Sequence, residues 1–220
     1  MYTTKNLFDL DHTIAKEYLE KYEYPWEALP EIKNFIKELI EKLDKNEYKE
    51  VAENVWAHKS VSIAPSASLT GPAIIGKDSE IRPSAYIRGN AIIGEGCVIG
   101  NSCEIKNAII FDKSQVPHFN YVGDAILGFH AHMGAGSIVS NLKADGRDVV
   151  IRDGEEVVET HLRKFGAMIG DNAEIGCNSV MNPGTVIGRN SNVYPLARVR
   201  GLVPANSIYK DEDNIVEKRQ

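Results

Sequence analysis

The sequence lacks several features that would assign it to a familiar class of protein. Among its 220 residues there are only three cysteines, Cys97, Cys103 and Cys177, and no Cys-x-x-Cys pair. The three cysteines are therefore expected to be reduced thiols and not to form a disulfide framework. No apolar stretch approaches the ~20 residues that a membrane-spanning helix needs. The amino terminus, MYTTKNLFDLDHT, has no basic region followed by an apolar run, so no secretory signal is expected. These absences predict a cytoplasmic protein with no membrane partner.

An excess of positive charge is also missing. The formal net charge is −6 at pH 7, which argues against a general affinity for nucleic acid. The sequence contains no Gly-rich phosphate loop ending in lysine and no Gly-x-Ser-x-Gly elbow. Nucleotide binding by a P-loop and serine-hydrolase chemistry are therefore not expected.

What the chain does contain is a repeat of six residues. Aliphatic residues open successive sixes, and the next residue is often glycine; the openers are Ile63, Leu69, Ile75, Ile81, Ile87, Ile93, Ile99 and Ile105, with Phe111 next. The register slips near residues 117–127 and returns from Ile169 to Val199. Hexapeptide repeats of this kind build short flat strands joined by corners. The pattern predicts a mainly β protein, a left-handed parallel β-helix over residues 51–210.

The flanking segments have different patterns. Residues 13–22 and 30–45 show apolar residues at helical spacing. They predict a small N-terminal helical cap, residues 1–50, that covers the open first coil; residues 1–45 are expected to be dispensable for chemistry. Residues 142–167 depart from the sixes and read as an ejected loop with a hairpin turn at Asp153-Gly154. Residues 211–220 are expected to form a C-terminal tail.

Two cations occupy the position that usually takes glycine. Arg88 and Lys106 each follow an isoleucine opener and are 18 residues apart. Three sixes make one triangular coil, so these side chains are expected to stack in adjacent coils about 4.8 Å apart. Two cations this close repel unless an anion lies between them, and phosphate suits both side chains. The alternative is that they are solvated, or paired with carboxylates such as Glu104 or Asp124.

Histidines provide the candidate acid–base chemistry. His118 lies in the irregular segment PHFNYVGD together with Tyr121, and histidine suits the removal of a proton from an attacking amine. His130 and His132 are two residues apart, so they share a face in an extended chain. With His118 they could hold zinc, although no further ligand pattern supports such a site.

The segments EIKNAII, VPHFNYVGDAILG and MGAGSIVSN, between residues 104 and 141, resemble a known family. It is the acetyltransferase half of the bifunctional N-acetylglucosamine-1-phosphate uridyltransferase/glucosamine-1-phosphate acetyltransferases, which are hexapeptide-repeat transferases. The resemblance covers roughly residues 55–210. It implies His118 as the catalytic base and Arg88, Lys106 and Tyr121 as ligands of the sugar phosphate. It also implies Asn141 in the amino-sugar pocket, Lys164 as the equivalent of a family lysine, and Cys177 near the thioester of acetyl-CoA.

The resemblance implies an acetyl-CoA-dependent N-acetyltransferase that acts on an amino-sugar phosphate, glucosamine-1-phosphate, in UDP-GlcNAc biosynthesis. It also implies a homotrimer. His132 and Met133 stand where the family has asparagine and isoleucine, which leaves the acceptor sugar open. The loop that opens the family's nucleotidyltransferase domain has no match in this sequence. Two alternatives remain: a metal-dependent lyase of the β-helical carbonic anhydrase type, using His118, His130 and His132, and a non-catalytic sugar-phosphate-binding module.

Overall fold

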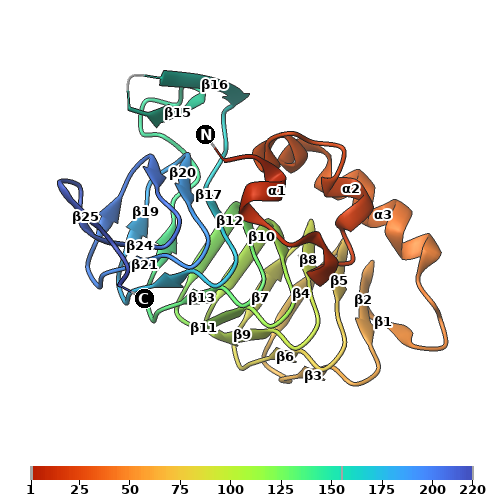
Figure 1. Cartoon of the computed structure of the whole chain (residues 1–220). Coiled ribbons are helices and arrows are strands. Elements are labelled where there is room, and N and C mark those ends of the chain that lie inside the picture. The colour runs from red at the N-terminus through yellow and green to blue at the C-terminus, as the bar shows by residue number, and fades with distance from the viewer. Residues whose placement is uncertain (1, 155, 220) are drawn as a thin grey trace.

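The computed structural model describes residues 2–154 and 156–219, and it is a prism of short parallel strands stacked coil upon coil (Figure 1). The first face contains β2 (Val55–His58), β5 (Ala73–Ile75), β8 (Ala91–Ile93), β17 (Ala167–Ile169), β20 (Thr185–Ile187) and β23 (Leu202–Val203). The second contains β4 (Ser68–Thr70), β7 (Tyr86–Arg88), β14 (Ile138–Val139), β19 (Val180–Met181) and β22 (Arg198–Val199). The long strands β10 (Glu104–Ile110) and β12 (Tyr121–Leu127) belong to both faces, because they pass through the corner between them.

The third face is a separate sheet. It contains β3 (Ser62–Ile63), β6 (Glu80–Ile81), β9 (Val98–Asn101), β11 (Gln115–His118), β13 (His132–Met133), β18 (Glu174–Ile175), β21 (Asn192–Val193) and β24 (Ser207–Asp211). The inward side chains of all three faces form one buried aliphatic core, as in Ile75, Ile93 and Ile110. Burying each such side chain contributes about 1.5–3 kcal/mol. The predicted mainly β, parallel β-helical fold is confirmed.

The slip of the repeat has a simple cause in the pairing of the strands. Ile87 pairs with Ile105 at a separation of 18 residues, whereas Ala91 pairs with Ala108 and Glu104 with Tyr121 at a separation of 17. Ala108 in turn pairs with Ala125, again at a separation of 17, so two successive coils are each a residue shorter. The expectation that Phe111 opens the next six was wrong: Ile110 points into the core, and the Phe111 ring packs outside, 5.1 Å from the ring centroid of Phe8.

The N-terminal helical unit lies along the first face and not over the first coil, so the predicted position of the cap was wrong. The unit comprises α1 (Thr4–Leu7), η1 (Leu10–His12), α2 (Lys16–Leu19), η2 (Pro25–Glu31) and α3 (Ile32–Lys42) (Figure 1). It covers a row of outward apolar side chains: Ile74, Ile92, Ile109, Ile126, Met168 and Val186, each at most 1% exposed. An apolar outer row must be buried against another element, and the amphipathic α3 supplies the matching face.

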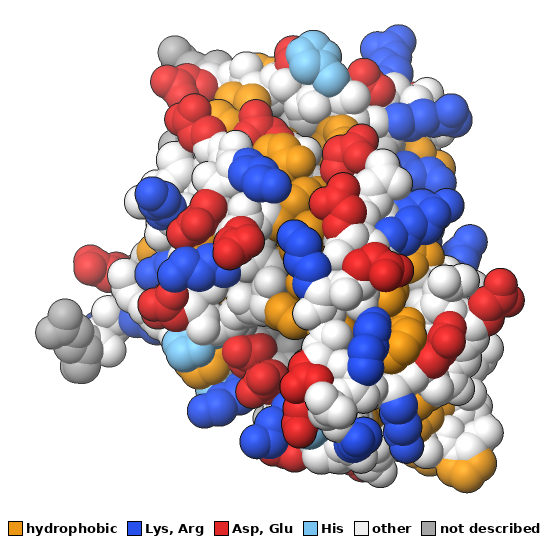
Figure 2. All heavy atoms as spheres, turned by 90° about the vertical axis from the view of Figure 1, so that its right-hand side faces the viewer, with side chains coloured by type: hydrophobic (Ala, Val, Ile, Leu, Met, Phe, Trp, Pro, Cys, Tyr) orange, Lys and Arg blue, Asp and Glu red, His pale blue; other side chains and the backbone are white. Residues whose placement is uncertain are grey.

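The open first coil is covered in another way. β1 (Tyr48–Ala52) pairs antiparallel with β2 and closes that edge, while β3 and β4 each have a strand neighbour on one side only. Figure 2 shows this end of the molecule, where apolar side chains lie between charges of both signs. Polar and charged side chains along a strand edge oppose pairing with another chain.

Two further segments leave the coils. β15 (Val149–Asp153) and β16 (Glu156–Leu162) form the hairpin expected within residues 142–167, and β17 resumes beside β12, so the core is not interrupted. The C-terminal segment is not simply a tail. β25 (Asn214–Glu217) pairs antiparallel with β24, because the last coil presents an open strand edge whose backbone groups need partners. Among the described residues, no helix is both long and apolar enough to cross a membrane.

We expect the contact between α3 and the first face to be a main source of stability. Ile36 in α3 is fully buried, so Ile36→Ala should lower the free energy of unfolding by about 2–5 kcal/mol. The neighbouring Lys37 is exposed, and Lys37→Ala should change it by no more than about 0.5 kcal/mol. Urea denaturation of both variants checks this. Equal stability of the two variants would show that the helical unit packs only loosely.

Candidate functional site

The candidate site lies at the corner where β10 and β12 pass from the second face to the first. Asn107 and Asp124 turn this corner in successive coils with positive φ angles of 48° each. Asparagine and aspartate are the non-glycine residues that adopt this left-handed conformation most readily. Lys106 precedes the corner and pairs with Gly123 of the next coil. The shortened coil therefore brings side chains from two neighbouring strands to one point.

Asp124 is the centre of this corner. Its carboxylate is 7% exposed and accepts from the Lys106 ammonium, with Nζ 3.1 Å from Oδ2. The Asn141 amide donates to the same oxygen, and the Asn107 amide donates to Oδ1 at 2.9 Å. A buried carboxylate needs such partners, because losing its hydration is costly. We call Lys106, Asn107, Asp124 and Asn141 the Asp124 cluster.

Tyr121 reaches this cluster because Gly123, two residues later on the same outward side of the strand, has no side chain. A Cβ atom at Gly123 would lie 2.4 Å from the Tyr121 hydroxyl, so any side chain there would displace the phenol. Partial burial raises the pKa of Tyr121 above its usual value. The phenol therefore stays protonated near neutral pH and can donate a hydrogen bond.

Arg88 and Lys106 are neighbours in adjacent coils, as the spacing predicted, since Ile87 pairs with Ile105 immediately before them. Each cation, however, has its own carboxylate. The Arg88 guanidinium donates to Glu104 at 2.8 Å, and this pair is exposed to solvent, whereas Lys106 pairs with the buried Asp124. Of the arrangements considered for these two cations, the structure therefore has the one in which Arg88 pairs with Glu104 and Lys106 pairs with Asp124.

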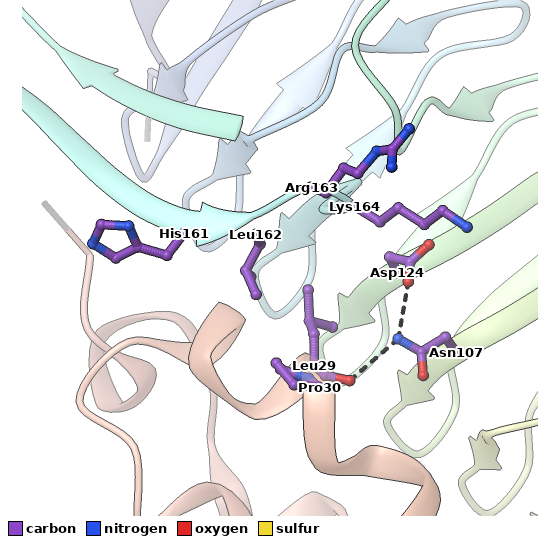
Figure 3. A pocket seen from close by; sticks show the side chains of 8 residues that line it. All are labelled: Leu29, Pro30, Asn107, Asp124, His161, Leu162, Arg163 and Lys164. Carbon is purple, nitrogen blue, oxygen red and sulfur yellow. Dashed lines mark hydrogen bonds between the residues drawn. The ribbon is translucent and has the colours of Figure 1, made fainter. Parts of the chain in front are cut away.

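Lys164 lies at the same corner, where the ejected hairpin returns to the solenoid. A cavity of about 320 Å³ is lined by Leu29, Pro30, Asn107, Asp124, His161, Leu162, Arg163 and Lys164. Figure 3 shows the Lys164 side chain directed toward Asp124. The backbone fixes this position, because Leu142 and Lys164 form an isolated bridge and Gly166 N donates to Asp124 O at 2.8 Å.

His118 and Cys177 lie on the third face and do not join the Asp124 cluster. His118 ends β11, pairs with Asn101 and exposes its ring. Extending the register of β11, β13 and β18 by whole residues places Ala135 and then Cys177 in the same column as His118. Two coil spacings of about 4.8 Å separate the histidine from the exposed thiol along this column.

Asn120 lies at the corner between β11 and β12, and the sequence patterns did not predict it as a site residue. Its buried amide accepts from His118 N at 3.0 Å and donates to Gly134 O at 2.8 Å. It thereby fixes the backbone between His118 and Tyr121. Asp124 and Asn107 were likewise not predicted as site residues. Their signal was present in the sequence, since Asn90, Asn107 and Asp124 are spaced by 17 residues at coil corners.

The three histidines on which a metal-dependent lyase would rely, His118, His130 and His132, are separated from one another. His132 pairs with Glu174, with Nδ1 2.8 Å from the carboxylate, and His130 turns a corner with its ring against Phe129. Within residues 2–154 and 156–219, no group of three His, Cys, Asp or Glu side chains could hold a metal ion.

The fold and this corner define a hexapeptide-repeat solenoid with a polar site beside a hairpin. Comparison with known families agrees: residues 69–162 match the GMPPB C-terminal domain, and residues 166–201 match the bacterial transferase hexapeptide (six repeats). The chain is 38% identical over 120 residues to the bifunctional protein GlmU of Methanococcus aeolicus, covering 54% of this chain and 29% of that one. The predicted resemblance to this group of proteins is confirmed.

A second relative is the bifunctional sugar-1-phosphate nucleotidylyltransferase/acetyltransferase of Sulfurisphaera tokodaii, 33% identical over 109 residues, covering 50% of this chain and 27% of that one. The chain thus spans about three tenths of the length of these curated relatives. Among solved structures, the acetyltransferase domain of PglB from Neisseria gonorrhoeae, in complex with acetyl coenzyme A, is similar with a TM-score of 0.39 and 14% identity. The match covers 74% of this chain and 57% of that one.

The two cation–carboxylate pairs should differ in their contribution to stability. Asp124→Asn leaves the half-buried Lys106 without its counter-ion, which should cost about 3–5 kcal/mol of the free energy of unfolding. Glu104→Gln breaks an exposed pair, which should cost no more than about 1 kcal/mol. Chemical denaturation of both variants measures this difference. Similar losses would mean that Asp124 is no more strongly coupled to its surroundings than Glu104.

Proposed function

We propose that this protein is an acetyl-CoA-dependent N-acetyltransferase whose acceptor is a phosphorylated amino sugar, glucosamine-1-phosphate. The observation that carries this proposal is the gathering of Lys106, Tyr121, Asn141 and Lys164 around Asp124 beside one cavity. These side chains offer ammonium, phenol and amide groups, which suit a sugar phosphate. The names of the relatives from Methanococcus aeolicus and Sulfurisphaera tokodaii support the same chemistry.

The proposed roles follow from the positions of the side chains. Lys106 holds the phosphate from the buried side, and Lys164 and Arg88 hold it from the solvent side. The exposed pair of Arg88 with Glu104 is weak, so a phosphate can replace the carboxylate at little cost. Tyr121 and Asn141 orient the sugar. Holding both substrates in one geometry converts a bimolecular reaction into an effectively unimolecular one.

The chemical step transfers an acetyl group from sulfur to nitrogen. The amine nitrogen attacks the thioester carbonyl carbon, a carbon–nitrogen bond forms, and the carbon–sulfur bond breaks to release coenzyme A as a thiolate. His118 takes the proton that the nitrogen loses, and the imidazolium then returns it to the leaving sulfur or to water. Acetyl-CoA lies along the column of His118 and Cys177 in this proposal.

The separation of His118 from the Asp124 cluster within one chain bears on the oligomeric state that we propose. Phe119, 60% exposed, and the buried Asn120 lie between them at the corner. We therefore include a homotrimer in the proposal, in which a neighbouring copy brings its own elements to the groove between the two surfaces. The proposed setting is the cytoplasm, where acetyl-CoA and sugar phosphates for UDP-GlcNAc biosynthesis occur, with small molecules as the binding partners.

A thiol-release assay tests this function. Purified protein with acetyl-CoA should release coenzyme A in the presence of glucosamine-1-phosphate, and little with glucosamine, which lacks the phosphate. His118→Ala should lower kcat by about 10²–10⁴ and change KM for either substrate little. His132→Ala is the control: this histidine also faces solvent on the third face, outside the proposed site.

Two results would contradict the proposal. The first is no thiol release with any phosphorylated amino sugar. The second is a His118→Ala variant that keeps more than about a tenth of the wild-type rate. Loss of activity in His118→Ala, His130→Ala and His132→Ala together with loss of bound zinc would favour the metal-dependent lyase instead.

A further inference from the structure

The cavity beside the Asp124 cluster is built from segments that are far apart in the sequence. Leu29 and Pro30 come from the N-terminal helical unit, Asn107 and Asp124 from the solenoid corner, and the remaining lining residues, 161–164, from the end of the hairpin. Figure 3 shows Leu29 and Pro30 facing Asn107 and Asp124, with Lys164 above them. The helical unit is therefore one wall of the candidate site as well as a cover for the apolar first face.

Asn107 joins this wall to the centre of the site. Its amide nitrogen donates to Leu29 O at 3.2 Å and to Asp124 Oδ1 at 2.9 Å. A side-chain amide has two N–H groups, so it can make both hydrogen bonds at once. Asn90 turns the same corner one coil earlier, also with positive φ, and makes no side-chain hydrogen bond within the described residues. The bridge is thus a property of Asn107 and not of the corner in general.

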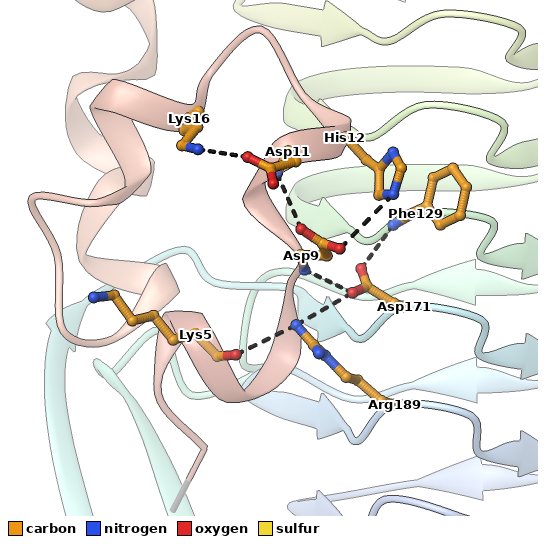
Figure 4. A network of polar contacts seen from close by, with 8 residues as sticks. All are labelled: Lys5, Asp9, Asp11, His12, Lys16, Phe129, Asp171 and Arg189. Atoms are coloured by element: carbon orange, nitrogen blue, oxygen red, sulfur yellow. Dashed lines mark hydrogen bonds and ion pairs between the residues drawn. The ribbon is translucent and has the colours of Figure 1, made fainter.

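The helical unit is held firmly to the solenoid at a second place, well away from the cavity. The buried Asp171 carboxylate accepts from Asp9 N at 2.7 Å and from Phe129 N at 2.8 Å (Figure 4). Arg189 pairs with Asp171 at 3.3 Å and also donates to Lys5 O. Burial raises the pKa of Asp171. Because these contacts and the packing of α3 anchor the unit, the Leu29–Pro30 wall has a fixed position over the corner.

The charges around the cavity suggest the kind of ligand. Asp124 is balanced by Lys106, whereas Arg163 and Lys164 at the rim have no acidic partner in the described part of the chain. An anionic group is therefore favoured at the rim and hydroxyl groups at the polar floor. The volume of about 320 Å³ is at the lower end of the range of ligand pockets, about 300–1,000 Å³. Such a cavity suits a single phosphorylated sugar better than a larger nucleotide sugar.

We propose that Asn107 is a positioning residue through which the N-terminal helical unit shapes the acceptor end of the site. This inference rests on the proposed function. The acceptor's sugar ring lies between the Leu29–Pro30 wall and Asp124, and its phosphate meets Lys164 together with Arg163. Asn107 holds Asp124 and the wall at the spacing that a monosaccharide phosphate requires. The helical unit is then part of the binding site, contrary to the expectation that residues 1–45 are dispensable for chemistry.

The test compares Asn107→Ser with Asn90→Ser. Serine already turns corners of this solenoid with positive φ at Ser84 and Ser102, so both variants should fold. A hydroxyl donates only one hydrogen bond, so the bridge between Leu29 and Asp124 is lost in Asn107→Ser. We expect its KM for glucosamine-1-phosphate to rise about tenfold or more, and its KM for acetyl-CoA to stay unchanged. Asn90→Ser should match the wild type in both.

Calorimetry with N-acetylglucosamine-1-phosphate, the proposed product, separates this inference from the proposed function. It should bind Asn107→Ser about tenfold more weakly than it binds the wild type and Asn90→Ser. If the wild type binds this ligand with that difference but transfers no acetyl group, the acetyltransferase proposal fails and the role of Asn107 stands. If the wild type transfers acetyl and Asn107→Ser has unchanged KM and affinity, the role of Asn107 is wrong.

If Asn107→Ser proves less stable, shown by a lower thermal midpoint, Asn107→Gly serves as a second variant for the same test. Glycine adopts the corner conformation without strain and removes the amide entirely. The same selective loss of acceptor affinity is expected for it. Equal weakening of acceptor and acetyl-CoA binding in both variants would indicate a purely structural role and overturn the proposal.

Discussion

Parallel pairing between successive coils is the constraint on which the rest of this structure depends. In the coils before the ejected hairpin it aligns each residue with the one 17 or 18 positions later, so side chains form columns along the faces and corners. Between Ile87 and Ala91 the corner holds residues 88–90, whereas between Ile105 and Ala108 it holds only Lys106 and Asn107. The next corner, between Val122 and Ala125, is equally short and holds only Gly123 and Asp124. The shorter corner places Lys106 next to the turn residue Asn107. It is what allows a cation, an amide and the Asp124 carboxylate to meet across adjacent coils.

The strands up to Ile105 and the neighbouring positions of Arg88 and Lys106 could be predicted from the sequence, because stacked coils of equal length impose a strict period of six. After Lys106 the period no longer applied. Phe111 was therefore assigned as the next opener, whereas Ile110 occupies that position in the core. A count of sixes does not reveal a shorter corner. The spacing of 17 residues between Asn90, Asn107 and Asp124 is its signal, and the pairing between coils shows where the residue is missing.

The predicted position of the N-terminal helical unit was wrong for a different reason. The helical periodicity shows that α3 has an apolar face, but not which surface covers it. A signal was present in the solenoid: triplets such as Ala73-Ile74-Ile75 and Ala91-Ile92-Ile93 place an isoleucine on the outside of the coil. An outward apolar residue repeated in successive coils indicates a covered face. The contact of Leu29 with Asn107 depends on tertiary packing and has no signature in either segment alone.

The central claim is that the corner around Asp124 is the acceptor site, and a crystal structure with coenzyme A and N-acetylglucosamine-1-phosphate tests it most directly. The account predicts the phosphate within hydrogen-bonding distance of Lys106 and Lys164. It also predicts the sugar ring against Leu29 and Pro30, and the coenzyme thiol beside the column of His118 and Cys177. A sugar phosphate bound away from this corner, with the Asp124 cluster undisturbed and facing only solvent, would contradict the account.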